Sequence, residues 1–432
     1  MKVKLLLLRE KVFPKERCYL IAILLNALIS GSVFSLIAIA ILTNQLAEVG
    51  YPIGKMGILA FATCPYSLKI LWAPFLDRYT VPFLCAKLGR RRGWAMATQI
   101  CLLLALLSLN LLDISPHRPF PILPMACIIF TIALFAAIQD TVWETYRIER
   151  PNTKEELPLS IASSSIGFRL GMFIGSVLSL DVAAKYGWHQ VYQMVFLLAH
   201  LGPITILCIR EPTSKISNTL QDKRNYFHII YKSILLLKEK QPYLLGALFF
   251  LLLYKSNDIL PMTVRVYLSN DLSFRNTDVS LSTKIGTLAA LAGSTLSGML
   301  IPKTGIYRGI RIAAIVQLLS PFMLMLLALI GHDILLFIGA TAVQFFVSGL
   351  AVTAFTTYSA SLCTSKWKTT QYTIIASINS ILRILLQTVA GLAASYLTWT
   401  QFFLGVMLLG IIAIVIFPMI FRKNTSGDQD YK

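Results

Sequence analysis

Long apolar stretches recur along almost the whole 432-residue chain, and this pattern constrains the fold more than any other feature. A helix of about 20 apolar residues is long enough to cross the ~30 Å hydrocarbon core of a bilayer. Only 14% of the residues are charged, whereas a soluble domain carries roughly 25%. The sequence therefore predicts an all-α integral membrane protein.

The apolar stretches number twelve, and a polar segment, 211–242, separates them into two sets of six. The predicted transmembrane spans are 18–43, 57–75, 94–112, 121–140, 159–181, 190–209, 243–268, 282–302, 311–330, 333–357, 372–396 and 399–421. The predicted divisions are a basic tail (1–17), an N-terminal half (18–210), a linker (211–242), a C-terminal half (243–421) and a second tail (422–432). Two sets of six spans around a polar linker are typical of the major facilitator fold, whose substrate binds near mid-membrane between the halves.

The distribution of Lys and Arg predicts the orientation in the membrane. With the N-terminus inside, the tails and cytoplasmic loops hold 29 basic residues and the external loops hold 4. Cytoplasmic loops carry an excess of Lys and Arg in membrane proteins. Both termini and the linker are therefore expected in the cytoplasm, and this bias accounts for the net charge of +19 without a nucleic-acid partner.

The polar residue types form no recognisable catalytic or metal-binding pattern. The five His residues have no HExxH or triad-like spacing, and no P-loop or nucleophile elbow is present. The seven Cys residues are scattered through apolar segments or cytoplasmic loops, so we interpret them as small buried hydrophobic residues. We expect a protein that is not an enzyme and needs no cofactor, and whose transport is driven by an ion gradient.

A charged loop follows the second predicted span, in the stretch "LWAPFLDRYTVPFLCAKLGRRRGW". One interpretation is a cytoplasmic gate, in which Asp77 pairs with Arg90, Arg91 or Arg92 when the two halves close. The alternative is that these basic side chains anchor the loop at the phospholipid surface. Gly89 lies twelve positions after Asp77, a wider spacing than in the general facilitator motif.

Three cations lie deep inside predicted spans: Arg169, Lys255 and Arg383. Each costs about 2.5–3.5 kcal/mol at a span centre on insertion scales, so we expect all three to face a polar cavity and bind substrate. Lys69 lies nearer a span end, where its long side chain is expected to reach the membrane surface. Gln139 and Asn257, which lie beside charged residues, complete the candidate substrate-binding set.

Three carboxyl groups are candidates for proton coupling: Asp140, Glu144 and Asp258. Asp140 and Glu144 fall on one helical stripe with Arg147, and Asp258 lies three residues after Lys255 on one helix face. Two structural alternatives remain open. The first group could be an ordinary solvated helix end, and the second could be a self-neutralising ion pair.

Several stretches together resemble one family, in the right order between residues 66 and 396: "YSLKILWAPFLDRYTVPFL", "GRRRGWAMATQ", "AAIQDTVWETYRIE", "IGFRLGMFIGS", "LLYKSNDILP", "STKIGTLAALAGSTLSGMLI" and "TTQYTIIASINSILRILLQTVAGLAASYL". They are similar to the AmpG-type muropeptide permeases of the major facilitator superfamily. In that resemblance Asp140, Arg169, Lys255, Asp258 and Arg383 occupy matching polar positions, whereas Glu144 stands where the family often has Asp.

The resemblance implies proton-driven import of N-acetylglucosaminyl-anhydro-N-acetylmuramyl peptides across the bacterial inner membrane, for peptidoglycan recycling. The implied partners are this anionic glycopeptide and the phospholipid bilayer, and a monomer is expected. Two alternatives remain open. One is a transporter of acetyl-CoA or another large organic anion, because the acetyl-CoA transporters are relatives. The other is a transporter-like sensor that binds ligand without moving it.

Overall fold

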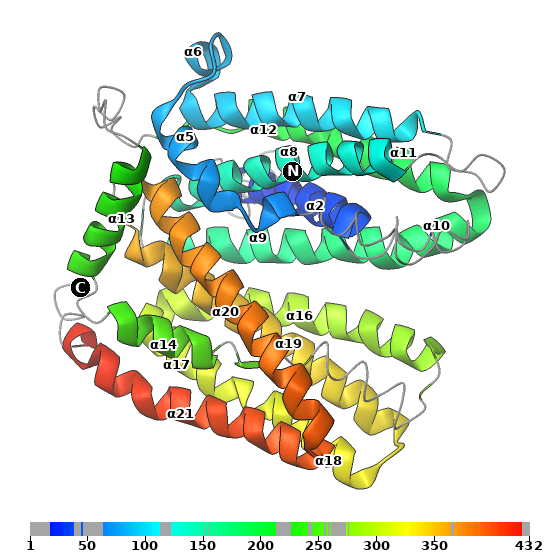
Figure 1. Cartoon of the computed structure of the whole chain (residues 1–432), viewed down its shortest axis with the longest axis vertical. Coiled ribbons are helices and arrows are strands. Elements are labelled where there is room, and N and C mark those ends of the chain that lie inside the picture. Colours follow the sequence, from blue (N-terminus) through cyan, green and yellow to red (C-terminus); the bar gives the residue numbers. More distant parts are fainter. Residues whose placement is uncertain are drawn as a thin grey trace, which may run out of the picture. The chain divides into compact units, whose positions relative to one another are not determined.

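The computed structural model describes residues 18–38, 45, 64–112, 122–151, 153, 155–212, 226–240, 244–254, 256–257, 260, 274, 276–363 and 367–425. Every regular element in this part of the chain is a helix (Figure 1). The all-helical fold predicted from the apolar stretches is therefore confirmed. The helices are named by their labels in Figure 1.

The chain forms two compact units that nearly follow the N-terminal and C-terminal halves. Unit 1 comprises Met1–Asn152, Ser163–Ile229 and Ser365–Thr373, and unit 2 comprises Thr153–Ala162, Ile230–Thr364 and Ile374–Lys432. The first residues of α20 (Lys368–Tyr396) thus belong to unit 1, although most of that helix belongs to unit 2.

Unit 1 is built mainly from the helices of the first half. Its elements are α2 (Cys18–Ala38), η2 (Cys64–Tyr66), η3 (Lys69–Leu71), α5 (Ala73–Arg78), α6 (Leu84–Leu88), α7 (Arg90–Asn110), α8 (Ile122–Glu149), α9 (Glu156–Phe173) with its π-helical continuation η4 (Ile174–Leu178), α10 (Ser179–Tyr186), α11 (Trp188–Ala199) and α12 (Leu201–Cys208). The first residues of α9 belong to unit 2. Buried apolar side chains from α2, α7, α8 and α11 form one core of this unit.

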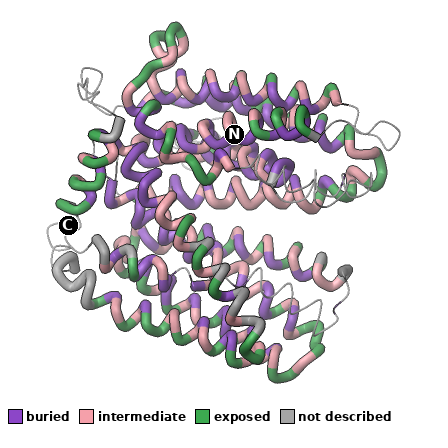
Figure 2. Tube along the Cα trace, viewed as in Figure 1, coloured by how far each residue is buried: buried purple, intermediate pink, exposed green. Residues whose placement is uncertain are grey.

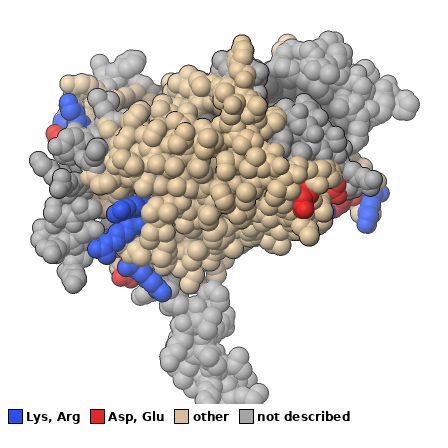
Figure 3. Space-filling view, turned by 90° about the horizontal axis from the view of Figure 1, so that it is seen from below, with Lys and Arg blue, Asp and Glu red and all other residues tan. Residues whose placement is uncertain are grey.

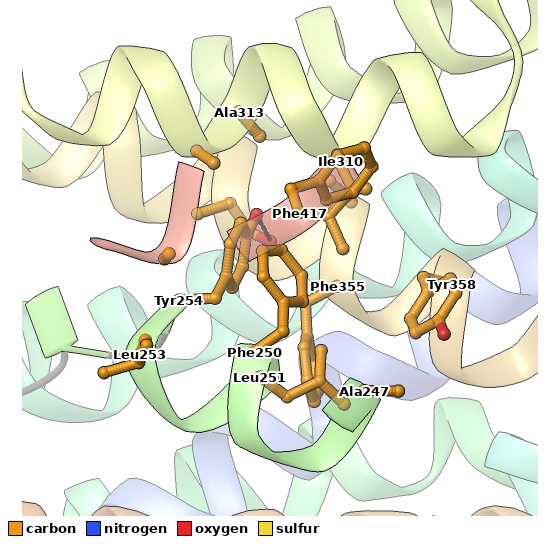
Figure 4. Close-up of a cluster of buried hydrophobic side chains, with 14 of the residues drawn as sticks. Ala247, Phe250, Leu251, Leu253, Tyr254, Ile310, Ala313, Phe355, Tyr358 and Phe417 are labelled. Carbon is orange, nitrogen blue, oxygen red and sulfur yellow. Dashed lines mark hydrogen bonds between the residues drawn. The ribbon is translucent and has the colours of Figure 1, made fainter. Parts of the chain in front are cut away.

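Unit 2 contains most of the remaining helices. They are α13 (Tyr226–Lys240), α14 (Leu244–Tyr254), α16 (Asn276–Thr304), α17 (Ile306–Gln317), α18 (Leu319–Ile330), α19 (Ile334–Leu362), α20 (Lys368–Tyr396) and α21 (Trp399–Thr425). Aromatic side chains from α14, α19 and α21 meet in its core, where Phe250 packs against Tyr254 and Phe417 (Figure 4). The Tyr254 hydroxyl donates a hydrogen bond of 2.9 Å to the Ala351 carbonyl.

Nine helical stretches of the described residues are long and apolar enough to span a membrane: Cys18–Ile37, Arg90–Asn110, Leu123–Glu149, Glu156–Tyr186, Trp188–Cys208, Leu281–Thr304, Ile306–Ile330, Ile334–Leu362 and Trp399–Pro418. They coincide with nine of the twelve predicted spans. The predicted spans 57–75 and 243–268 lie partly outside the described residues, and 372–396 lies within α20.

The exposed surface has the character expected in lipid. Leu104, Leu197 and Leu288 expose 62%, 67% and 69% of their surface. Exposing this much apolar surface to water would be unfavourable, whereas contact with lipid hydrocarbon carries no such cost. Helices such as α7, α16 and α21 carry both buried and exposed stretches (Figure 2). Figure 3 shows a broad face whose middle carries no coloured charge, while Lys, Arg, Asp and Glu gather at its margins.

Each unit contains a helix crossing at which a glycine touches the backbone of its neighbour. A Cβ added at Gly171 of α9 would lie 2.0 Å from the Leu28 carbonyl oxygen of α2. In unit 2, a Cβ at Gly293 of α16 would lie 2.0 Å from the Phe346 carbonyl oxygen of α19. Small residues permit this close approach between membrane helices, so both positions require glycine.

Two local predictions were wrong. All seven Cys residues are free thiols, but Cys18, Cys127 and Cys208 are exposed and not buried, because they lie on the outer faces of their helices. The second concerns helix ends. α7 begins at Arg90 and α8 continues to Glu149, although the predicted spans begin at 94 and end at 140.

Candidate functional site

Buried charges meet in unit 1 between η3 and α8. The Lys69 ammonium forms an ion pair with the Asp140 carboxylate and lies 3.4 Å from Oε1 of Glu144. Asp140 and Glu144 are four residues apart on α8 and therefore share one helix face. The prediction that Lys69 reaches the membrane surface was wrong, because this cation turns inward and its side chain is only 14% exposed. Two carboxylates thus share one lysine.

Arg147 extends this cluster by one further turn of α8. Its Nη1 donates a 2.6 Å hydrogen bond to Oγ of Ser164 on α9. Its Nη2 donates a 2.9 Å bond to the Tyr372 hydroxyl in the first turns of α20, and lies 3.9 Å from Oε1 of Glu144. The two hydroxyls orient the guanidinium group without neutralising it. We call Lys69, Asp140, Glu144 and Arg147 the charge cluster.

A second group of charges holds the start of α20 within unit 1. The Asp77 carboxylate accepts hydrogen bonds from the Thr369 hydroxyl (2.5 Å) and from both the backbone N–H and the hydroxyl of Thr370 (3.0 Å each). The first N–H groups of a helix have no partner inside the helix, and a carboxylate there also interacts favourably with the helix dipole. Asp77 therefore caps α20.

Arg91 links this capping carboxylate to α8. Its Nη2 lies 3.1 Å from Oδ1 of Asp77, and its Nε and Nη2 bind both carboxylate oxygens of Glu149 at 2.9 and 2.8 Å. The three side chains expose only 3%, 2% and 5% of their surface. A two-bond Arg–carboxylate pair is geometrically specific and strong when buried, so Arg91 fixes the position of Asp77.

Arg90 and Arg92, the other predicted gate residues, have different roles. The Arg90 side chain donates to the backbone oxygen of Asp77 at 3.0 Å. Arg92 donates to the carbonyl oxygens of Ile206 and Leu207 at the end of α12, at 3.0 and 3.1 Å. Arg92 thus satisfies the unpaired carbonyls of a helix C-terminus and does not pair with Asp77 among the described contacts.

The start of α7 is capped by Glu211, the first residue of the predicted linker. Its two carboxylate oxygens accept the backbone N–H groups of Arg91 (2.8 Å) and Arg92 (3.1 Å). Gly89 precedes them with a φ of +93°, and a Cβ there would lie 2.5 Å from the Glu211 side chain. This stretch requires glycine for both reasons.

The predicted substrate-binding amides have partners inside their own units. Gln139 accepts a hydrogen bond from the Thr98 hydroxyl and donates to Oε1 of Gln99 at 2.5 Å, which ties α8 to α7. Asn257 donates to the Gln317 backbone oxygen at 2.8 Å. It also lines a small cavity of unit 2 with Tyr254, with room for about one water molecule.

The predicted cationic residues are described to different extents. Arg169 lies half-buried on α9. Lys255 and Asp258 lie outside the described residues, and the structure describes the backbone of Arg383 on α20 but not its side chain. Of the candidates, the structure brings together Asp140 with Glu144, and Asp77 with Arg91. Across the described ranges, no group of three or more His, Cys, Asp or Glu residues has metal-binding geometry.

Sequence reasoning missed several partners of these groups: Glu149, Ser164, Glu211, Thr369, Thr370 and Tyr372. A usable signal existed for one pair, because Thr369 and Thr370 precede an apolar run as helix-capping residues do. Glu149 would follow from extending the fourth span through "TVWETYRIE". The other contacts join residues far apart in sequence, and no local pattern marks them.

The comparisons with known proteins agree with this architecture. The Major Facilitator Superfamily profile matches residues 19–387. The AmpG 3 protein of Rickettsia prowazekii (strain Madrid E) is 45% identical over 414 residues, which cover 95% of this chain and 97% of that protein. The anhydromuropeptide permease of Escherichia coli (strain K12) is 28% identical over 359 residues, which cover 81% and 69%.

Two solved structures share the fold at 13% sequence identity. One is the proton:xylose symporter XylE bound to 6-bromo-6-deoxy-D-glucose, with a TM-score of 0.66 over 92% of this chain and 95% of that chain. The other is the human organic anion transporter MFSD10, with a TM-score of 0.64 over 94% and 100%. The protein is therefore a multi-pass membrane protein that belongs to the Major Facilitator Superfamily and, within it, to the AmpG family of transporters, which are not enzymes.

Proposed function

We propose that the protein is a proton-coupled importer of anhydro-muropeptides across the bacterial inner membrane, serving peptidoglycan recycling. The observation that carries this proposal is the charge cluster of unit 1, in which two carboxylates share Lys69 and lie beside Arg147. Ionisable groups inside a membrane protein are costly and mark proton and substrate pathways. The anhydromuropeptide permease of E. coli, a relative at 28% identity, supports the choice of substrate.

Proton coupling is assigned to the carboxyl groups Asp140, Glu144 and Asp258. The substrate's carboxylates are assigned to Arg169, Lys255 and Arg383, because a guanidinium group can grip a carboxylate through two parallel hydrogen bonds. Gln139 and Asn257 are also proposed to contact substrate, in competition with the neighbours that their amides bind within their own units.

Asp77 and Arg91 are proposed to act as a gate. Asp77 holds the start of α20 in unit 1 through its buried contacts with Thr369 and Thr370, and Arg91 pairs with Asp77. Alternating access requires contacts that form in one state and break in another. We assign Arg90 a supporting role at the Asp77 backbone and Arg92 a bracing role at α12.

The proposed topology has twelve spans, with both termini in the cytoplasm, and keeps the divisions 1–17, 18–210, 211–242, 243–421 and 422–432. It rests on the bias of 29 to 4 basic residues. Reporter fusions after residues 92 and 240 should report a cytoplasmic location. A periplasmic signal at either position would contradict this topology.

The proposed function is tested by uptake into proteoliposomes. One proton moving down 100 mV supplies about 2.3 kcal/mol, enough for roughly 50-fold accumulation of a neutral solute. We expect labelled anhydro-muropeptide to accumulate when a proton gradient is imposed and to equilibrate without one. Accumulation of acetyl-CoA in its place would favour the organic-anion alternative. Uptake that saturates at one ligand per protein would indicate a sensor.

A further inference from the structure

Two of the membrane-spanning stretches are interrupted near a proline in the same way. In unit 1 the stretch Trp188–Cys208 is interrupted at His200, which separates α11 from α12 and lies three residues before Pro203. A proline has no N–H to donate to the carbonyl four residues earlier, and its ring crowds that carbonyl, so the helix bends there. The carbonyl freed in this way belongs to Ala199, which is fully buried.

The same arrangement recurs in unit 2. The stretch Ile306–Ile330 is interrupted at Leu318, which separates α17 from α18 and lies three residues before Pro321. The freed carbonyl belongs to Gln317, which is also buried. At both interruptions the middle residue, His200 or Leu318, donates its N–H to the carbonyl three residues earlier at 3.1 Å. The two bends therefore share their local geometry as well as their proline.

A side-chain amide from another segment of the same unit supplies the donor that each proline lacks. Nε2 of Gln99 on α7 donates to the Ala199 carbonyl at 2.7 Å. Nδ2 of Asn257 donates to the Gln317 carbonyl at 2.8 Å. Gly202 makes room for the first amide, since a Cβ there would lie 2.4 Å from the Gln99 amide carbon. A buried carbonyl without a partner is costly, so each amide stabilises its bend.

The first bend is linked by hydrogen bonds to α8, the helix that carries most of the charge cluster. A carbonyl can only accept, so Gln99 must turn its NH2 group toward Ala199 and its oxygen toward Gln139. Gln139 donates to that oxygen at 2.5 Å, and its own oxygen accepts from the Thr98 hydroxyl. The carbonyl that Pro203 frees thus sets the orientation of the Gln139 amide, which the proposed function assigns to substrate.

We propose that Gln99 and Asn257 are the latches of two proline hinges, and that spans 190–209 and 311–330 change their bend at these hinges during transport. An amide is neutral, so it can leave its carbonyl without stranding a charge in a poorly solvated place. A bend held by one side-chain hydrogen bond can change when that bond alone is lost. The inference deepens the proposed function, because it rests on a carrier that alternates between forms and names two places where it bends.

The first test is a double-mutant cycle that needs no substrate. Gln99→Met leaves the Ala199 carbonyl without a donor and should raise the unfolding equilibrium constant about tenfold in SDS titrations of purified protein. Pro203→Ala restores a backbone N–H for that carbonyl, so in this background the effect of Gln99→Met should be about tenfold smaller. The loss of the Gln139 partner is common to both backgrounds and cancels. Additive effects would overturn the latch.

The second test measures the bend itself. Nitroxide labels at the exposed positions Gln193 and Leu207 of a cysteine-free variant lie on either side of the first hinge. Pulsed electron resonance should give a main distance from the bent form and a longer, less populated one. Gln99→Met should raise the longer population about tenfold, and Pro203→Ala should make it the main one. One unchanged distance in all three proteins would overturn the hinge.

The second hinge is tested in the same two ways. Asn257→Leu and Pro321→Ala form the cycle, and labels at the exposed positions Ile315 and Leu329 report the bend. Pro418→Ala is the matched control, because this exposed proline lies inside α21 without interrupting it. Its effect should add to that of Asn257→Leu. If Gln99→Met does not fold, the cycle of unit 2 decides, and additivity there overturns the proposal.

The last test concerns transport and uses Pro203→Ala, which keeps Gln99, Gln139 and every charged residue. Exchange of labelled N-acetylglucosaminyl-anhydro-N-acetylmuramyl tripeptide across proteoliposomes should slow about tenfold with an unchanged dissociation constant, whereas Pro418→Ala should exchange as wild type does. An unchanged exchange rate in Pro203→Ala would overturn the role of the hinge in transport. If wild type neither binds nor exchanges this tripeptide, the proposed substrate is refuted, and the stability cycles and label distances still decide on the hinges.

Discussion

Replacing Asp77 by Asn tests whether this carboxylate holds α20. The two oxygens accept four hydrogen bonds, from Arg91, the Thr369 hydroxyl, and the N–H and hydroxyl of Thr370. An Asn amide has the same shape but only one oxygen, so its NH2 group must face donors on one side. The Thr370 hydroxyl can rotate to accept, whereas the Thr370 N–H cannot.

The expected loss follows from these contacts. Removing one member of a buried ion pair costs 3–5 kcal/mol, although Arg91 keeps Glu149 as a partner. We therefore expect the low end, about 3 kcal/mol for the contact between Asp77 and α20. That energy shifts the equilibrium toward the released first turn of α20 by roughly 100-fold.

A reporter cysteine measures this release. Thr373 is fully buried in the first turns of α20, so Thr373→Cys should react with a water-soluble thiol reagent only when this segment opens. In a background without native cysteines, Asp77→Asn should raise the reaction rate roughly 100-fold, in proportion to the open population. Asp181→Asn, the same change at an exposed position of unit 1, should leave the rate unchanged.

An unchanged rate in folded Asp77→Asn protein would refute the reasoning. If that variant does not fold, Thr370→Val serves as a milder perturbation. It removes the hydroxyl contact (3.0 Å) and keeps the charge pair. It should raise the rate about fivefold, the value of a hydrogen bond of about 1 kcal/mol, and no change there would equally refute the role of Asp77.

Three further predictions concern other parts of the molecule. Gly171→Ala should lower the free energy of unfolding by about 1–3 kcal/mol through overpacking, whereas Gly339→Ala, with no atom within 4 Å of the added Cβ, should be neutral or slightly stabilising in the same thermal unfolding assay. Lys69→Met should abolish gradient-driven uptake because two carboxylates lose their shared cation, and Lys69→Arg should restore part of it; equal uptake in both would contradict the charge cluster. Burial raises the pKa of the Cys85 thiol, so less of it is thiolate at a given pH. In a variant with Cys85 as its only cysteine, the alkylation rate should therefore rise at higher pH than it does for a free thiol. A pH midpoint of alkylation at or below that of the free thiol would contradict this.

The sequence predicts most of the fold because each span carries its own signal. Apolar length alone located nine described spans to within a few residues at most ends. The largest difference falls at Glu149, nine residues beyond the predicted end of its span, and α7 likewise begins with charged residues, four before its predicted start. Those charges lie in helices because Arg91 and Glu149, 58 residues apart, neutralise each other. A pairing at that distance leaves no local mark in the sequence.

The part of the candidate site that depends on local spacing was also predictable from the sequence. The spacing of Asp140, Glu144 and Arg147 places them on one face of a helix, and they lie together in the structure. The position of Lys69 near a span end predicted that its side chain reaches the membrane surface. Its counter-charge is instead supplied by Asp140, which lies 71 residues later in the chain. Local position predicts how a charge could reach water, and only the fold supplies a partner that makes this unnecessary.

The glycine crossings in both units have a consequence for what can rearrange during transport. At Gly171 and Gly293 a backbone carbonyl faces a Cα, so these two contacts involve no side-chain rotamer. The glycine contacts lose no side-chain entropy on folding, and they themselves offer no soft torsion through which the two helices could shift separately. In a carrier that works by rocking nearly rigid parts, such contacts supply stiffness, and motion is left to helices joined by longer side chains. The same property limits evolution: any residue larger than glycine must first separate the helices, so the spacing at these crossings cannot drift by single small substitutions.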